Sequence, residues 1–158
     1  MNKKDLMIRA VLEASKNLKS LDGGPFGAVI ARKGRVLAVA HNTVLRTKDP
    51  SCHAEVNAIR LAARKLKSFD LSGGSELFST TEPCPMCFSA IHWARIDHVY
   101  YGTTIADVGK LGFNELAIPA SRMKRLGQSR VKLTKGFLKT ECAELLKRWK
   151  SLPIRPVY

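Results

Sequence analysis

Hydrophobic residues recur at helical spacing near the start of the chain and then shift to the continuous short runs typical of buried strands. The apolar positions Met7, Ala10, Val11, Ala14, Leu18 and Leu21 predict a first helix over residues 3–19. The turn-forming run 21–25 ends it. The apolar runs 26–31 and 36–41 flank Arg32-Lys33-Gly34-Arg35, so they predict a β-hairpin.

Helical and strand patterns alternate through the rest of the chain. A helix is expected after Asp49-Pro50-Ser51, with an inward stripe of Ala54, Ile59, Ala62, Ala63 and Leu66. Strands are predicted at 76–81, 97–102 and 131–134, and further helices from Pro83 to about Arg95, at 120–126 and at 140–150. The loops are 72–74 and 103–119, and residues 151–158, with two prolines, form an extended tail.

This alternation of strands and helices predicts the α/β fold class. Strands separated by a helix pair in parallel through right-handed crossovers, so the fourth and fifth strands are expected to be parallel, beside the antiparallel hairpin. Ligands of such sheets bind at the carboxyl ends of the strands. The residues with the strongest chemical signal fall at those ends.

Two short segments carry that signal: Pro50-Ser51-Cys52-His53-Ala54-Glu55 and Glu82-Pro83-Cys84-Pro85-Met86-Cys87. Together they have the H-x-E and P-C-x-x-C signature of zinc-dependent deaminases. His53, Cys84 and Cys87 supply the imidazole and thiolate ligands that zinc prefers. A set of three leaves one position for water, whose pKa falls from ~15.7 to about 7 on zinc.

Glu55 is a hard carboxylate beside soft thiolates, so we assign it to proton transfer rather than to the metal. We expect His53 and Glu55 in the first turn of one helix and Pro83 near the first position of the next. The positive ends of both helices would then help to keep the thiolates and the Glu55 carboxylate ionised.

Two other interpretations of the cysteines remain open. Cys84 and Cys87 have the spacing of a redox pair, although the upstream His53 has no role in one. A closed structural zinc site would need a fourth ligand, for which Cys52 and Cys142 are the candidates.

The composition of the chain indicates the number of domains and the cellular compartment. The chain has 158 residues, 45% of them hydrophobic, which suits one domain spanning 1–158. Four cysteines, most near one metal site, indicate a reducing compartment rather than a disulfide framework. We expect a cytoplasmic protein without a signal peptide or membrane span.

The charge raises the question of nucleic acid. Lys and Arg total 27 against 13 Asp and Glu, a net charge of +14. The basic residues are spread along amphipathic stretches, without the interleaved aromatic residues of a strand-binding platform. A nucleic acid substrate is therefore the less favoured alternative.

Beyond the metal motif, the chain resembles the guanine deaminase branch of the cytidine deaminase superfamily over nearly its whole length. The matching runs are Gly23-Gly24-Pro25-Phe26-Gly27-Ala28-Val29-Ile30, His41-Asn42, Asp49 to Arg60, Glu82 to Cys87, Ala90 to Arg95 and, more loosely, Gly109 to Phe113. The resemblance implies a three-layer α/β/α fold, one Zn²⁺ per subunit and conversion of guanine to xanthine and ammonia. It also implies a homodimer whose C-terminal segment, 151–158, closes the active site.

The same resemblance assigns further site residues. It implies that Phe26 and Trp93 flank the base, that Asn42 and the Ala54 backbone hydrogen-bond to it, and that His53 packs against it while binding zinc. Glu115 would be a second acid that contacts the departing amine, and Tyr158 would close over the base.

Three departures from the branch keep alternatives open. Cys52 stands where relatives often have Ala, and Phe113-Asn114-Glu115 stands where guanine deaminases often have Phe-Asp-Asp. The basic charge is more typical of tRNA-specific adenosine deaminases, whereas Pro85 and Trp93 fit the free-base enzymes. The alternatives are therefore a tRNA adenosine deaminase, a guanosine or cytosine deaminase and a non-catalytic zinc module.

Overall fold

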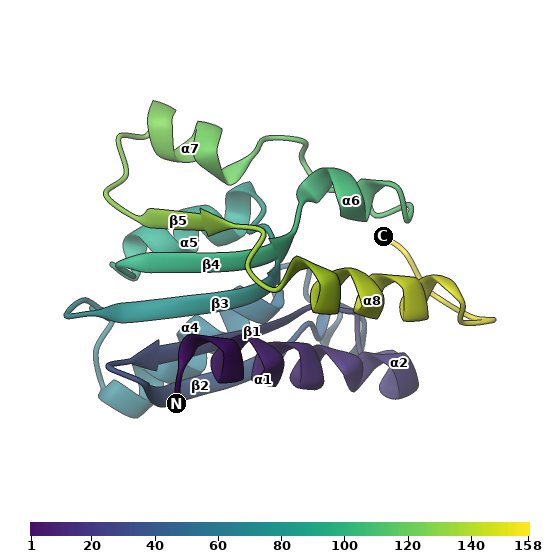
Figure 1. Ribbon diagram of the computed structural model, residues 1–158, viewed down its shortest axis with the longest axis horizontal. Helices are drawn as coiled ribbons and strands as arrows, with labels where there is room; N and C mark the ends of the chain where they lie inside the picture. The colour runs from purple at the N-terminus through teal and green to yellow at the C-terminus, as the bar shows by residue number, and fades with distance from the viewer.

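The computed structural model describes residues 1–158 and contains a five-stranded mixed sheet with the order β2-β1-β3-β4-β5 (Figure 1). The hairpin strands β1 (Gly27–Arg32) and β2 (Arg35–His41) are antiparallel, and β1 also pairs antiparallel with β3 (Ser75–Thr81). β4 (His98–Thr103) and β5 (Lys132–Lys135) continue the sheet in parallel with β3. The predicted class and the parallel pairing of strands four and five are confirmed.

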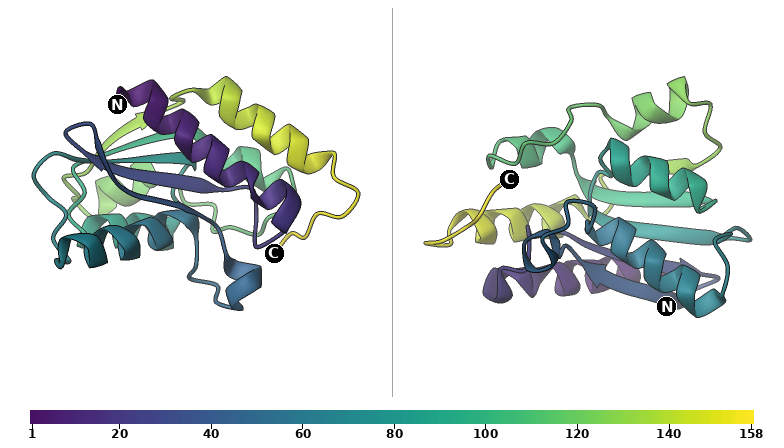
Figure 2. Two further views of the ribbon diagram at one scale, coloured as in Figure 1. Left: turned by 90° about the horizontal axis from the view of Figure 1, so that it is seen from below. Right: turned by 180° about the vertical axis from the view of Figure 1, so that it is seen from behind.

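Helices cover both faces of the sheet, which gives the three layers (Figure 2). One face carries α1 (Lys3–Ser15), α2 (Asn17–Ser20) and α8 (Lys139–Lys150). The other carries α4 (Ala54–Leu66), α5 (Pro85–Trp93) and α7 (Ala120–Leu126). None of the helices has the length and apolarity needed to cross a membrane.

The first predicted helix is interrupted once. An Asn2–Asp5 capping box starts α1, and Lys16 separates α1 from the short α2. The inward stripe continues across this break, because Ala10, Ala14 and Asn17 are all buried.

The apolar stripe of α4 is shifted from the expected one. Ala54, Ala58 and Ala62 are fully buried, whereas Ile59 and Leu66 lie at the edge of the contact. Alanine has a short side chain, so this face of α4 packs closely on β1 and β2.

Two short helices were not predicted, one in a stretch without a predicted element and one within the expected loop 103–119. They are α3 (Val44–Thr47) and α6 (Ile105–Gly109). Each is about one turn long, too short for a hydrophobic period to appear. The start of α6 nevertheless has a local signal, because Thr104 and Asp107 form a capping box.

Candidate active site

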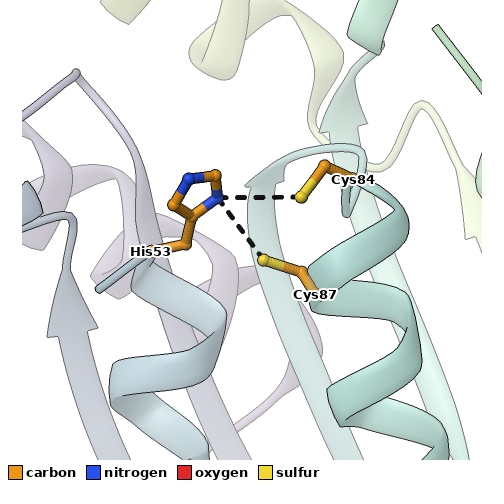
Figure 3. Close-up of side chains that lie close together, drawn as sticks. All are labelled: His53, Cys84 and Cys87. Atoms are coloured by element: carbon orange, nitrogen blue, oxygen red, sulfur yellow. Dashed lines mark hydrogen bonds between the residues drawn. The ribbon is translucent and has the colours of Figure 1, made fainter. Parts of the chain in front are cut away.

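Three side chains from two helix starts converge at the carboxyl end of the sheet (Figure 3). His53 is the N-cap of α4, Cys84 is the N-cap of α5, and Cys87 lies in the first turn of α5. His53 Nδ1 lies 3.7 Å from Cys84 Sγ and 3.5 Å from Cys87 Sγ. Zinc bonds of ~2.3 Å to sulfur and ~2.0 Å to nitrogen at tetrahedral angles require a separation of about 3.6 Å. The three ligand atoms therefore fit a zinc ion.

The helix boundaries differ by a residue or two from those expected. His53 precedes the first turn of α4 in extended backbone conformation, and Pro85, rather than Pro83, occupies the first helical position of α5. Proline suits that position because its missing N–H has no intrahelical partner. Both helix N-termini still point at the ligand cluster, as the sequence predicted.

The protonation of Cys84 suits a metal ligand. A hydrogen bond with Cys87 lowers the pKa of Cys84 to about 4, although its burial opposes the shift. The thiolate is the form that binds zinc.

Neither candidate fourth ligand belongs to the cluster. The three residues in ligand range of one another are His53, Cys84 and Cys87 alone. The Cys52 thiol donates to Asp49 Oδ2 and accepts from Arg60, while Cys142 packs with the apolar residues beneath α1. The arrangement is therefore that of an open three-ligand site.

Glu55 lies against the ligand cluster. Its Oε1 accepts a 3.0 Å hydrogen bond from Ser79 on β3, and its Oε2 lies 3.6 Å from Cys87 Sγ. Burial raises the pKa of Glu55 above its ordinary value. Burial therefore opposes the effect of the α4 N-terminus, and the expectation that the helix keeps the carboxylate ionised stays a prediction. A buried carboxyl group with a raised pKa beside the ligand cluster is suited to accept a proton and pass it on.

A cavity of about 230 Å³ opens beside the ligands, and we call it the substrate cavity. Six of the predicted site residues line it: Phe26, Asn42, His53, Cys84, Glu115 and Tyr158. Ala54 is the first residue of α4, so its backbone N–H has no intrahelical acceptor. The structure thus gathers most of the predicted set around one space.

Two buried polar atoms at this cavity have no partner, namely Asn42 Nδ2 and Glu115 Oε2. Buried polar groups are nearly always hydrogen-bonded, so each orphaned atom suits a ligand. Burial, with contributions from the charges of Cys84 and Glu55, raises the pKa of Glu115 to about 7. Glu115 can therefore hold a proton or accept a hydrogen bond at neutral pH.

Tyr158 reaches the cavity from the end of its own chain. Its hydroxyl accepts a 2.9 Å hydrogen bond from the Gly24 N–H and donates a 2.8 Å hydrogen bond to Asn42 Oδ1. Its ring packs edge-on against Phe113 at 5.5 Å. The last residue is thus tied to the walls of the substrate cavity.

Trp93 is the exception among the predicted contacts. It is the last residue of α5, its side chain is 77% exposed, and it does not line the substrate cavity. Because α5 starts at the ligands and runs away from them, the single chain does not bring Trp93 to the base position.

Sequence reasoning missed two residues that support the site. Ser79 holds Glu55, and the fully buried Asn17 donates from Nδ2 to the carbonyl oxygens of Gly24 and Asn42 at 2.7 and 2.8 Å. The sequence did contain a signal for a supporting role of Asn17. It is a polar residue that follows Ala14 at helical spacing on the buried face, where it needs partners.

Comparison with known proteins agrees with this geometry. Residues 1–103 match the family described as "Cytidine and deoxycytidylate deaminase zinc-binding region". The chain is 41% identical to guanine deaminase of Bacillus subtilis over 115 residues, 73% of either protein. It is 38% identical to the tRNA-specific adenosine deaminase of Aquifex aeolicus over 98 residues, 62% of this chain and 64% of that one. The solved structure of guanine deaminase from Nitrosomonas europaea superposes with a TM-score of 0.82 at 30% identity, covering 93% of this chain and 84% of that chain.

The chain therefore belongs to the cytidine and deoxycytidylate deaminase family. It is a zinc-dependent hydrolase that acts on a carbon–nitrogen bond, with His53, Cys84 and Cys87 as the metal site. The zinc ion supplies the chemistry that activates water for attack on carbon.

Proposed function

We propose that the protein hydrolyses guanine to xanthine and ammonia. The observation that carries this proposal is the pair of orphaned atoms, Asn42 Nδ2 and Glu115 Oε2, which line one cavity with His53. A purine base presents ring and carbonyl acceptors for an amide donor, and the exocyclic amine of guanine presents donors for a carboxylate. The similarity to guanine deaminases supports the same choice.

The size and charge of the substrate cavity favour a free base. Its volume of about 230 Å³ is below the ~300–1,000 Å³ typical of drug-sized ligands. No Lys or Arg lines it, despite the net charge of +14. A tRNA substrate is bound mainly through Lys and Arg at its phosphates, and the cavity lining supplies none of these contacts.

The two buried acids have different roles, because Glu55 transfers protons and Glu115 binds the departing amine. Glu55 takes a proton from the attacking water and delivers it to a ring nitrogen of the base. Glu55 then carries the remaining proton of the added water to the amine, so that the carbon–nitrogen bond breaks, the base gains a carbonyl, and ammonia leaves as the second product. Glu115 binds the departing amine, while Asn42 and the Ala54 N–H hold the base.

Aromatic residues would enclose the base. Phe26 lies edge-on to Phe113 with 5.1 Å between ring centroids, and His53 lines the same cavity. In this proposal residues 151–158 form a lid whose Tyr158 excludes water from the base. The whole chain, 1–158, then works as one deaminase domain.

We infer in addition that the chain forms a homodimer that covers Trp93. Trp93 is 77% exposed, and a large exposed aromatic residue is of the type enriched at protein–protein interfaces. Sedimentation of the wild type and of Trp93→Ala tests this assembly, and a monomeric wild type would contradict it.

Four free cysteines support a reducing location such as the cytoplasm.

A substrate panel tests the proposed function. Purified zinc enzyme is assayed for ammonia release from guanine, guanosine, cytosine and adenine, and from a tRNA anticodon stem. We expect guanine to give the highest kcat/KM. A higher value for the tRNA stem with a steep salt dependence would assign the chain to the adenosine deaminases instead.

A further inference from the structure

Two more cavities adjoin the substrate cavity. An inner cavity of only about 10 Å³ lies at the ligands and is lined by Glu55, Glu82, Glu115 and their neighbours. A third cavity, of about 580 Å³, lies beside α6 and α7; we call it the rear cavity. Glu115 lines all three cavities, and Glu82 lines the inner and rear ones. The reaction centre therefore borders a second large cavity besides the substrate cavity.

Glu82 is held rigidly where the inner and rear cavities meet. It is buried, its Oε1 accepts a 3.0 Å hydrogen bond from the Ala120 N–H, and its Oε2 accepts a 3.2 Å hydrogen bond from the Ile105 N–H. These bonds join the starts of α6 and α7 to one carboxylate. The side chain is thus a fixed wall rather than a mobile one.

Glu115 is held less firmly than Glu82. Its Oε2 is buried without a partner, and the side chain belongs to the exposed segment that joins α6 to α7. A carboxylate with an open acceptor that faces three cavities can remain bound to an amine as the amine passes from one cavity to the next.

The charge of the rear cavity suits a small cation. Its lining contains the two carboxylates Glu82 and Glu115 and one cation, Lys135. Hydroxyl groups of Tyr101, Thr104 and Ser121 add acceptors. The two other large cavities, of about 660 and 430 Å³, contain neither of these carboxylates.

We propose that the rear cavity is the exit path for the ammonium ion, which leaves past Glu115 and Glu82 while the product base still fills the substrate cavity. This proposal rests on the proposed function in one respect only: the enzyme must hydrolyse a carbon–nitrogen bond and so release an amine. After the carbon–nitrogen bond breaks, ammonia takes up a proton and becomes ammonium, and solvent replaces that proton on the enzyme. The base and Tyr158 obstruct the front, so the cation leaves along the carboxylates.

Bulky side chains at the outer walls of the rear cavity test this path. Ser121 and Ala106 are exposed, line the rear cavity and have no contact with the ligand cluster. The double variant Ala106→Trp/Ser121→Trp fills the space from both helices. Ser68→Trp is the matched control, because Ser68 is exposed and lines none of these cavities. Zinc content and circular dichroism confirm that each variant is folded.

The readout separates product release from chemistry. On the base that the wild type deaminates best, we expect kcat of the double variant to fall about fivefold or more, with kcat/KM unchanged within about twofold. Rapid-quench measurements should show the first turnover at the wild-type rate, followed by a slower steady state. Ser68→Trp should match the wild type.

Two results would count against the proposals, and they differ. A wild type that deaminates no base refutes the proposed function and the exit path together. An active wild type whose double variant has the kcat of Ser68→Trp, or a raised KM at unchanged kcat, refutes the exit path alone.

Discussion

Removing the hydroxyl of Tyr158 should open the lid without disturbing the metal site. The Tyr158→Phe variant loses the bond accepted from Gly24 and the bond donated to Asn42 Oδ1. The Gly24 N–H would be left without its partner. The ring contact with Phe113 and the bond from the Asn114 N–H to the Tyr158 carbonyl remain, so the tail keeps its path with a weaker hold.

The magnitude follows from the two lost bonds. Each net hydrogen bond contributes ~0.5–1.5 kcal/mol, so the closed lid loses about 1–3 kcal/mol relative to the open one. Because ~1.4 kcal/mol is a factor of ten in an equilibrium constant, the closing equilibrium constant should fall about 5-fold to 150-fold, and kcat/KM for guanine should fall by up to that factor. Zinc content and Tm should remain near wild type, because these bonds lie outside the core.

Steady-state kinetics on guanine, metal analysis and thermal melts together make the assay. Ile154→Ala is the matched control, because that side chain is 73% exposed on the same tail. Deleting residues 153–158 should lower kcat/KM at least as much as Tyr158→Phe. A Tyr158→Phe enzyme with the kcat/KM of Ile154→Ala would refute the reasoning and leave the tail without a role in closure.

Further variants probe the metal, the acids and the supporting amide. Cys84→Ala should lose most of its zinc; retention of full zinc would mean that the ligand assignment is wrong. Glu55→Gln should keep zinc and lose about 100-fold to 10,000-fold in kcat, and a loss below about tenfold would remove Glu55 from proton transfer. The pKa of Glu115 is raised to about 7, so its carboxylate form, which binds the departing amine, and the activity that needs it should increase as pH rises through 7; Glu115→Gln should lack this pH dependence, and an unchanged profile would contradict the role. Asn17→Ala removes both bonds to the carbonyls of Gly24 and Asn42, so KM for guanine should rise while the zinc content stays constant, and an unchanged KM would show that Asn17 does not position the cavity.

The sequence alone determined the class of fold and the metal ligands. The alternation of strand and helix patterns predicted the mixed sheet, because parallel pairing follows from the crossover helices. The ligands were predictable because His53, Cys84 and Cys87 each lie at or near a helix start. At such a position the same few residues supply the metal-binding side chains and the sequence signal for the start of the helix. The positions of such residues depend little on the rest of the fold, because adjacent residues specify the helix start that positions them.

Tertiary structure decided what surrounds those ligands. Asn17 meets Gly24 and Asn42 only because α2 packs against the end of β2, and Tyr158 meets Asn42 only because the tail returns across the fold. Trp93 shows the reverse, since a residue near the motif in sequence lies on the outside of α5 in the folded chain. Such contacts join segments far apart in the chain, so neither local propensity nor hydrophobic period encodes them. The raised pKa values of Glu55 and Glu115 have the same origin, because burial exists only once the layers have packed.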